Sequence, residues 1–350
     1  NGYGIYSSAP GQDMPESRRI RAVLMLIAIA VIASLFLNCQ KGSGGKYTGP
    51  VEKVNLGAVA VESSSLLYIA DALGMFMDNG LDVTIIDFPD GVKASADLLK
   101  DSVDVAAVAD FIFVTRSFKR NDLRIFGSIF RGDTFEIIAR KDRGITEPAD
   151  LKGRRIGLTK GTVLDFFMGA FLSTHGISAE NVRLVDLKPS EIAEAISSGS
   201  VDAVYAWEPY AGQIRANLGS NALTWPGQSG QNYQFVLMAK EEFIARRPIV
   251  VERLLKALLE AEKYGSEHTA DAQNIIASRR GYDPALLQSV WKRSDFRIRL
   301  DQNLVTLMED EAKWAMRRRL TAKKDMPDYL RFIHWESLER IKPEAVRIIH

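Results

Sequence analysis

The sequence contains a single cysteine, Cys39, among its 350 residues. A lone cysteine excludes an internal disulfide and any metal or redox site built from several cysteines. Because no other ligand spacing suggests a metal, we expect neither a metal nor a cofactor. Net charge is also nearly absent, since 45 Lys and Arg residues offset 44 Asp and Glu residues. Without a global positive field, nucleic acid is not an expected partner.

Long apolar runs are scarce, and the uncharged run at residues 22–37 is shorter than the ~20 residues of a membrane-spanning helix. Arginines precede this run, and a charged segment before an apolar core is typical of a secretory signal. Cys39 follows the run almost directly, which resembles the end of a bacterial lipobox. Phe36 and Asn38 stand where that motif usually has Leu and a small residue.

Two interpretations of residues 1–39 follow from this pattern. Cys39 is the lipid attachment site of a cleaved signal, or the segment is an uncleaved helical anchor. Both place the rest of the chain outside the cytoplasmic membrane and attached to it. Residues 40–50 are rich in Gly and Ser, which predicts a flexible tether. Residues 1–13 precede Met14, a more natural start for the signal, and are left out of the fold prediction.

From residue 54 onward, short β-branched runs alternate with segments of helical period, the pattern of an α/β protein with parallel sheets. After residue 239 we expect helices, which form a helical C-terminal region. The predicted strands are residues 54–60, 82–86, 103–108, 135–140, 155–159, 182–186, 201–206 and 235–239. The predicted helices are residues 65–77, 92–100, 163–175, 190–198, 248–264, 270–279, 284–292, 301–319 and 336–341.

Two halves of this region are alike at an offset of about one hundred residues. Val103-Asp104-Val105-Ala106 matches Val201-Asp202-Ala203-Val204, and an acid follows each match, Asp110 in one half and Glu208 in the other. This offset exceeds the ~20–50 residues of a solenoid repeat and indicates two similar lobes. Ligands of open α/β sheets bind beyond the carboxyl ends of strands. We therefore expect Asp110 and Glu208 on opposite walls of one cleft, although either could be an ordinary loop residue.

Two segments of the second half carry local chemistry. Thr162 with Asp165 resembles a capping box, and Gly161 exposes backbone N–H groups at a helix N-terminus, where an anion can bind. Lys160 would add positive charge, but the turn could also do no more than cap the helix. In residues 207–210, Trp207 offers a rigid face for a small molecule, or it belongs to the core.

Residues 69–83 resemble the Ala-x3-Gly-x-Phe-x3-Gly-Leu-x-Val segment of ABC-transporter substrate-binding proteins for nitrate, sulfonate, taurine and thiamine-pyrimidine precursors. Residues 150–157, 201–210 and 248–258 match the same family, and the resemblance covers about residues 51–350. It implies a type II periplasmic-binding-protein fold, with two α/β lobes joined by two crossing strands and closing on ligand about a hinge. The crossing strands would be residues 135–140 and 235–239. The first lobe would comprise residues 51–139 and 235–350, and the second residues 140–234.

The family resemblance also implies a function and a ligand wall. The chain would be the solute-binding component of an ABC importer, a monomer whose partners are a small solute and a membrane permease. Thr162 and Lys160 favour an anion such as a sulfonate or carboxylate, the acids favour an amine or N-heterocycle, and a zwitterion suits both. The expected ligand-binding residues are Ser63, Ser64, Ser65, Asp110, Phe111, Lys160, Gly161, Thr162, Asp165, Trp207 and Glu208.

Three other functions stay open at this point. The solute could be an N-heterocycle like a thiamine precursor, or the chain could be a ligand-sensing receptor subunit that is not coupled to transport. The same fold family also includes a pyrimidine synthase that depends on a cysteine-rich iron site and a histidine. No cysteine follows Cys39, and the four histidines fall in predicted helices or terminal segments. We therefore expect that the protein is not an enzyme.

Overall fold

The computed structural model describes residue 2 and residues 46–349. The chain divides into residues 1–46 and residues 47–350, and the second unit carries the sheets and helices described here. The predicted signal, Cys39 and residues 40–45 of the predicted tether lie outside the described residues. Tyr47 is already attached to this unit, since its N–H donates to the Asp78 carbonyl at 2.8 Å and the Arg253 guanidinium lies 3.9 Å from its ring centre. Within the described residues, no helix is long and apolar enough to cross a membrane.

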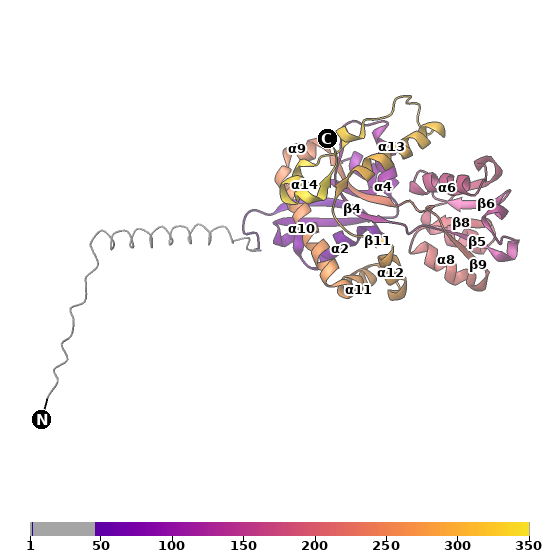
Figure 1. Cartoon of the computed structure of the whole chain (residues 1–350), viewed down its shortest axis with the longest axis horizontal. Coiled ribbons are helices and arrows are strands. Elements are labelled where there is room, and N and C mark those ends of the chain that lie inside the picture. Colours follow the sequence, from indigo (N-terminus) through magenta and orange to yellow (C-terminus); the bar gives the residue numbers. More distant parts are fainter. Residues whose placement is uncertain (1, 3–45, 350) are drawn as a thin grey trace. The chain divides into compact units, whose positions relative to one another are not determined.

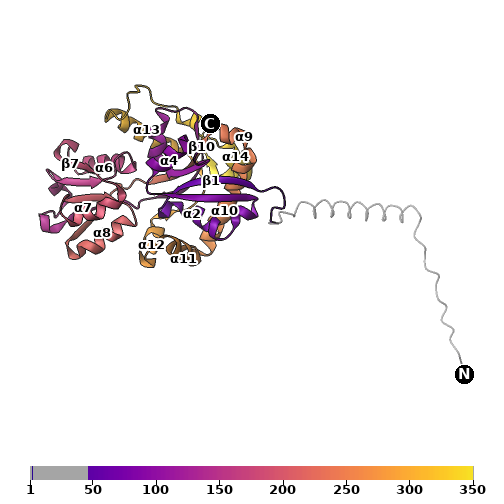
Figure 2. The ribbon, with the colours of Figure 1, turned by 180° about the vertical axis from the view of Figure 1, so that it is seen from behind.

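The unit consists of two lobes, each a β-sheet with helices on both faces (Figures 1 and 2). The first sheet has the strand order β11-β4-β10-β3-β1-β2. Within it, β1 is parallel to β2 and β3, and β10 is antiparallel to β3 and β4. These strands are β1 (Glu52–Val59), β2 (Leu81–Phe88), β3 (Val105–Ala109), β4 (Leu123–Gly132), β10 (Tyr233–Lys240) and β11 (Ser294–Asp295).

The second sheet repeats this arrangement with the order β7-β6-β8-β5-β9. Here β6 is parallel to β7 and β8, and β5 is antiparallel to β8 and β9. The order matches β2-β1-β3-β10-β4 of the first sheet strand for strand, which confirms the predicted fold of two similar α/β lobes. The strands are β5 (Glu136–Arg140), β6 (Arg155–Leu158), β7 (Arg183–Asp186), β8 (Ala203–Ala206) and β9 (Ala222–Pro226).

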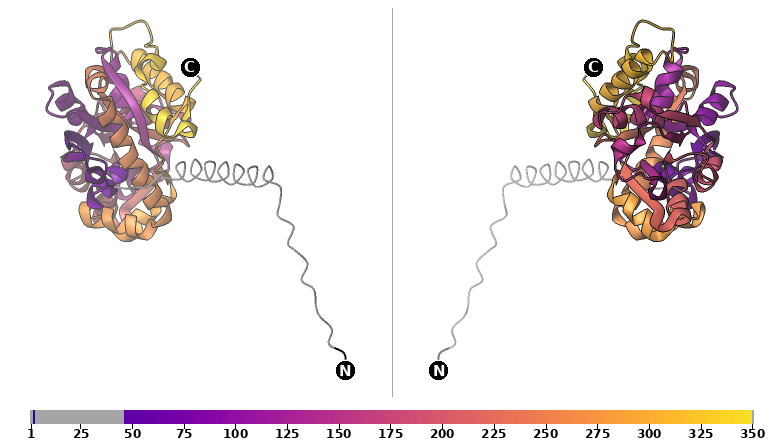
Figure 3. Two further views of the ribbon diagram at one scale, coloured as in Figure 1. Left: turned by 90° about the vertical axis from the view of Figure 1, so that its left-hand side faces the viewer. Right: turned by 90° about the vertical axis from the view of Figure 1, so that its right-hand side faces the viewer.

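The predicted helices begin within two residues of their expected starts, whereas α5, α8 and α9 were not predicted. The predicted helix 65–77 is divided in two, because Gly74 adopts a left-handed conformation with φ 70°. The C-terminal helices, orange to yellow in Figure 3, surround the first sheet. The helices are α2 (Ser65–Ala72), α3 (Met75–Asp78), α4 (Gly91–Leu99), α5 (Asp110–Ser117), α6 (Val163–Thr174), α7 (Ile192–Ser197), α8 (Tyr210–Leu218), α9 (Glu241–Arg246), α10 (Pro248–Glu267), α11 (Thr269–Arg280), α12 (Pro284–Lys292), α13 (Gln302–Arg317) and α14 (Glu336–Ile341). Two short strands, β12 (Leu300–Asp301) and β13 (Val346–Arg347), pair near the C-terminus.

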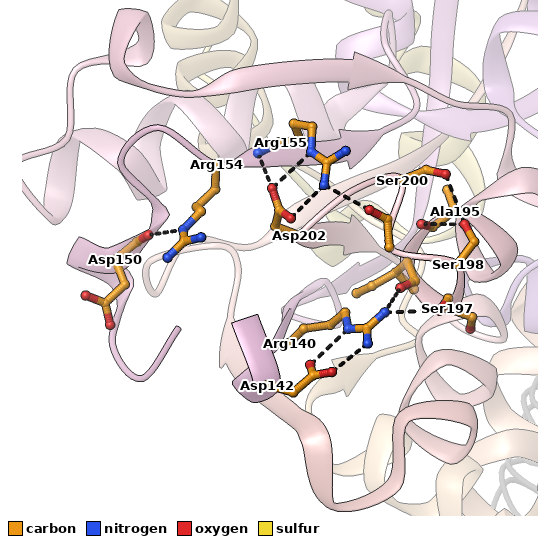
Figure 4. Close-up of polar contacts among 12 residues, drawn as sticks. Arg140, Asp142, Asp150, Arg154, Arg155, Ala195, Ser197, Ser198, Ser200 and Asp202 are labelled. Atoms are coloured by element: carbon orange, nitrogen blue, oxygen red, sulfur yellow. Dashed lines mark hydrogen bonds and ion pairs between the residues drawn. The ribbon is translucent and has the colours of Figure 1, made fainter. Parts of the chain in front are cut away.

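The sequence repeat corresponds to equivalent contacts in the two lobes. Asp104 precedes β3, and one of its carboxylate oxygens accepts the Asn55 N–H of β1 at 2.8 Å. Asp202 precedes β8 and accepts the Arg155 N–H of β6 at 3.0 Å, together with two bonds from the Arg155 guanidinium (Figure 4). Each acid therefore fixes the start of one parallel strand against its neighbour.

The chain crosses between the sheets at residues 133–135 and again at residues 227–232. The predicted crossing strands are thus the strands that follow these segments, β5 in the second sheet and β10 in the first. Gln228 joins the two crossings. Its side-chain oxygen accepts the backbone N–H groups of Thr134 and Phe135 at 2.8 and 3.0 Å, and its amide nitrogen donates to the Gly132 carbonyl at 3.0 Å.

Helix α13 of the first lobe also contacts α6 of the second. The indole of Trp314 packs edge-on against Phe166, with ring centres 5.9 Å apart, and against Phe111 at 5.7 Å. Gly169 makes room for it, because a Cβ at that position would lie 2.5 Å from the indole nitrogen. One continuous hydrophobic core therefore extends across this side of both lobes.

Candidate functional site

Four helix N-termini converge between the lobes at the carboxyl ends of parallel strands. The chain turns from β1 into α2, from β2 into α4, from β3 into α5 and from β6 into α6. Unpaired backbone N–H groups and the helix dipole make such ends favourable for negative charge. Two of the ends are capped by side chains, since Asp90 accepts the Lys93 N–H and Thr162 accepts the Leu164 N–H.

A pocket of about 440 Å³, called here the interlobe pocket, lies at these helix ends. Most of its wall is apolar, and both lobes contribute to it. The lining residues are Val59, Val61, Glu62, Ser63, Asp90, Gly91, Ala109, Ile112, Phe135, Thr162, Val163, Trp207, Tyr233 and Phe235.

Glu62 is the most unusual polar residue of the interlobe pocket. Its side chain is 1% exposed, and its Oε1 accepts the Thr134 hydroxyl of the crossing segment at 3.0 Å. Its Oε2 is buried and has no hydrogen-bond partner among the described residues. Burial, with a smaller contribution from the nearby Glu208 carboxylate, raises the pKa of Glu62 to about 7, while hydrogen bonds from its own backbone N–H and from Thr134, together with Arg293, oppose the shift.

Trp207 supplies an unpartnered donor from the second lobe. It follows β8 and is 7% exposed, and its ring packs edge-on against Tyr210 with centres 6.1 Å apart. The indole Nε1 is buried and donates to no partner among the described residues. A buried donor without a partner costs about 1–3 kcal/mol, so a ligand acceptor at this point would be stabilising.

Two aromatic residues at the crossings between the sheets also line the interlobe pocket. Phe135 of the first crossing stacks on Tyr233, which begins β10 after the second crossing, with ring centres 4.3 Å apart and planes at 24°. The Tyr233 hydroxyl is 2.5 Å from the Ser63 hydroxyl. Both crossings therefore meet the N-terminus of α2 at the base of the pocket.

Three of the predicted ligand-binding residues line the interlobe pocket: Ser63, Thr162 and Trp207. Ser64 and Ser65 are buried beside them, but their hydroxyls donate to backbone carbonyls, Ser64 to Val59 at 2.7 Å and Ser65 to Glu62 at 2.5 Å. These two hydroxyls fix the turn from β1 into α2.

Asp110 and Glu208, expected on facing walls, are both turned into their own lobes and do not line the interlobe pocket. The Asp110 carboxylate accepts the Gln234 N–H at 2.8 Å and lies against the buried Glu311 carboxyl of α13. Burial raises the pKa of Asp110 to about 7. Glu208 accepts the Arg215 guanidinium at 2.7 Å and the Gly212 N–H at 2.8 Å.

Phe111 follows Asp110 and is also fully buried. Its ring lies between the Trp314 indole and the Phe166 ring, whose centre is 6.4 Å away. It belongs to the core that joins the two lobes.

Lys160 and Gly161 lie in the turn before α6, and Asp165 lies in the first turn of that helix. Asp165 accepts the Gly161 N–H at 2.5 Å, and burial raises the pKa of Asp165. Lys160 and Asp165 line a groove of about 1,320 Å³, called here the α6–α13 groove, together with Trp314 and Arg318 of the C-terminal region. This groove is separate from the interlobe pocket in its lining residues.

The sequence prediction missed Glu62, Asp90 and Phe135. Glu62 directly precedes the serines that were predicted, and Asp90 follows β2 as Asp110 follows β3, so a search of every strand end would have included both. Phe135 stood inside an expected crossing strand. The prediction gave this strand a connecting role and did not consider its side chains as pocket wall. Within the described residues, no group of three or more His, Cys, Asp or Glu side chains could hold a metal.

Comparisons of the chain with known proteins find a matching family model and several relatives. A family model described as NMT1/THI5 like matches residues 62–272. A protein of Bacillus subtilis (strain 168), provisionally named an aliphatic sulfonates-binding protein, is 26% identical over 305 residues, which is 85% of this chain and 91% of that protein. The taurine-binding periplasmic protein of Escherichia coli K12 is 27% identical over 135 residues, 38% of this chain and 41% of that protein.

An enzyme is among the relatives, and a solved structure shares the fold. The 2'-hydroxybiphenyl-2-sulfinate desulfinase of Rhodococcus erythropolis is 25% identical over 238 residues, 52% of this chain and 65% of that protein. The alkanesulfonate-binding protein of Xanthomonas axonopodis pv. citri, solved with MOPS bound, superposes with a TM-score of 0.71 at 18% identity. The superposition covers 82% of this chain and 100% of that one.

Proposed function

Because this chain belongs to the NMT1/THI5-like family, we propose that it is the extracytoplasmic solute-binding component of an ABC importer. The observation that carries the proposal is an interlobe pocket lined by residues of both lobes, among them Glu62 and Trp207. Each of these two has a buried side-chain atom without a hydrogen-bond partner among the described residues, Oε2 in Glu62 and Nε1 in Trp207. A solute that satisfies both atoms would hold the lobes together. Relatives named for binding sulfonates and taurine support the assignment.

Closure about the two crossings is the proposed mechanism. The crossings are short and are joined by Gln228, so they can act as one hinge, while the helices that bear the pocket wall move with their own sheets. Ligand contacts to both lobes would favour the closed arrangement by their differential affinity for it. A closed, liganded protein is then the form delivered to a membrane permease.

The proposed solute is a small organic molecule with an anionic group, a sulfonate, a carboxylate or a zwitterion. Four helix N-termini support the anion, and the apolar wall supports an organic body. An N-heterocycle related to thiamine precursors remains the alternative solute. We further propose that the protein is a monomer held at the membrane by Cys39 or by a helix in residues 1–39.

Thermal melting tests solute binding directly. The panel contains alkanesulfonates, taurine, nitrate, carboxylates, amino acids and pyrimidines. A true ligand at one hundred times its Kd stabilises the folded protein by about 2.7 kcal/mol. If no member of the panel raises the melting temperature, the proposed function is wrong.

Two matched alanine variants locate the site. Ala109 lines the interlobe pocket and Ala179 lines the α6–α13 groove, and both are half-buried. Ala109→Leu should abolish the ligand-induced melting shift because its side chain fills the pocket, whereas Ala179→Leu should keep the shift. The reverse result would move the site to the α6–α13 groove.

The relationship to a desulfinase calls for a test of turnover. We propose binding without chemistry, because the polar groups of the interlobe pocket include no nucleophile held by a neighbouring base. The Ser63 hydroxyl, for example, meets the Tyr233 hydroxyl. Mass spectrometry of the bound solute after prolonged incubation should recover it unchanged. A product that accumulates with protein concentration would contradict this.

A further inference from the structure

Glu62 and Trp207 both line the interlobe pocket, and each has one buried polar atom without a hydrogen-bond partner among the described residues. Glu62 belongs to the first lobe, where it follows β1, and Trp207 belongs to the second, where it follows β8. One offers an acceptor and the other a donor, and both atoms are buried without a hydrogen bond among the described residues. Buried polar atoms in folded proteins are normally satisfied, so an orphan pair in one pocket indicates a missing ligand.

The charges around the pocket favour a particular ligand at Glu62. Its described lining includes two acids, Glu62 and Asp90, and no lysine or arginine, and Arg293, which acts on Glu62 electrostatically, does not line the pocket. Asp90 already accepts a backbone N–H as the cap of α4, whereas Glu62 receives one hydroxyl hydrogen bond on Oε1. A buried carboxylate is stable only with a cation or with donors that satisfy it. The helix N-termini do not fill this role at Oε2, since that atom has no N–H partner in the described part of the chain.

We propose that Glu62 selects solutes that carry a nitrogen-borne hydrogen-bond donor, cationic in the strongest case, and that Trp207 donates to an acceptor elsewhere on the same solute. This inference rests on the proposed solute-binding function and narrows its ligand class. An aliphatic sulfonate or carboxylate without such a nitrogen leaves Oε2 unpaired and binds weakly. A zwitterionic amino acid or aminosulfonate, or an amino-substituted heterocycle, satisfies both atoms.

Substitutions of Trp207 and of Glu62 should change solute binding in different ways, so the roles of the two residues can be tested separately. Glu62→Gln keeps the size of the side chain and its acceptor for Thr134 but removes the negative charge. Trp207→Phe keeps an aromatic ring in the wall and removes the N–H donor. Glu62→Gln should weaken the binding only of solutes that carry a nitrogen donor. Trp207→Phe should weaken the binding of solutes with and without such a donor.

The test compares matched solutes by isothermal titration calorimetry on the full-length protein. Taurine is paired with ethanesulfonate for the amino-acid type, and 4-aminopyrimidine with 4-methylpyrimidine for the heterocycle type. We expect the nitrogen-bearing member of one pair to bind at least tenfold more tightly than its analogue, which also identifies the type of solute. In Glu62→Gln this preference should fall to less than twofold.

A buried glutamate outside the pocket provides the control. Glu311 is fully buried on α13 and does not line the interlobe pocket, so Glu311→Gln should keep the tenfold preference. Circular dichroism melting of each variant shows that it is folded. Equal affinities within both pairs, or a preference that survives in Glu62→Gln, would overturn the assignment to Glu62.

The outcome also distinguishes this inference from the proposed function. If the tightest binder of the melting panel carries no nitrogen donor, the inference is wrong and solute binding stands. If no solute of the panel binds, the proposed function fails and the inference fails with it.

Discussion

The buried Glu62 carboxyl predicts a specific pH dependence of stability. Burial raises its pKa from 4.5 to about 7 in the folded protein, because the charged form is poorly solvated there. A group whose folded pKa is raised contributes stability that is fully present below its unfolded pKa and is lost as pH rises through the folded pKa. The folded protein should therefore lose stability from about pH 4.5 upward.

The magnitude follows from the size of the shift. One pKa unit corresponds to 1.36 kcal/mol, so a shift from 4.5 to about 7 corresponds to about 3 kcal/mol near pH 8. Glu62→Gln removes the titrating group and keeps an acceptor for the Thr134 hydroxyl. Relative to the wild type, the variant should gain up to about 3 kcal/mol in free energy of unfolding between pH 5 and pH 8.

Urea denaturation at pH 5, 6, 7 and 8, followed by circular dichroism, measures this difference. Other buried acids, such as Asp110 and Glu311, titrate in both proteins and cancel in the comparison. The charged groups that act on Glu62, Glu208 and Arg293, are also unchanged. A difference between variant and wild type that stays constant across this range would refute the buried, poorly satisfied state of Glu62.

Three further substitutions test the architecture. Gln228→Ala leaves two backbone N–H groups of the first crossing without their acceptor and should cost about 3 kcal/mol in urea denaturation, whereas an unchanged midpoint would show that the crossings are not joined there. Gly169→Ala should lower the melting temperature, because the new Cβ would lie 2.5 Å from the Trp314 indole nitrogen. In a Trp314→Ala background the same change should instead stabilise α6 by up to about 1 kcal/mol, since Ala favours a helix more than Gly does. Stabilisation in both backgrounds would disprove the contact. The Arg155 guanidinium lowers the pKa of Asp202, so Asp202→Asn should reduce the free energy of unfolding by about 1 kcal/mol or less at pH 7, because solvent screens this partly exposed pair. The cost should shrink as pH falls below 4, and a cost independent of pH would contradict the ion pair.

Most strands of the fold were predictable because buried parallel strands are continuous apolar runs. The strand β4 was missed although its apolar side chains are buried. Gly127 and Ser128 interrupt its apolar run, and two register shifts against β10 disturb the alternation that marks a strand. Pairing with β10, which is distant in sequence, decides its conformation, and such pairing is not visible in a local window.

The helices α5 and α8 show a related limit. Both directly follow a parallel strand, and the prediction treated their first residues as loop positions that carry ligand contacts. In the structure Asp110 begins α5 and Glu208 precedes α8 by two residues. The sequence repeat located these acids correctly at equivalent strand ends but gave no information on the direction of their side chains.

The direction of those side chains depends on partners elsewhere in the chain. Glu208 turns towards Arg215, seven residues later in the chain, and Asp110 turns towards the Gln234 N–H, which the second crossing brings back to the first sheet. Only the tertiary structure places these partners. The interlobe pocket was therefore predictable as a location, at the ends of equivalent strands, while the identity of its polar residues was only partly predictable.

A crystal structure of the complex with the solute that gives the largest melting shift tests the central claim most directly. The account predicts that the solute occupies the interlobe pocket, with a nitrogen within hydrogen-bond distance of Glu62 Oε2 and an acceptor within hydrogen-bond distance of Trp207 Nε1. A solute bound in the α6–α13 groove beside Lys160 and Arg318, or in the pocket with neither contact, would contradict it.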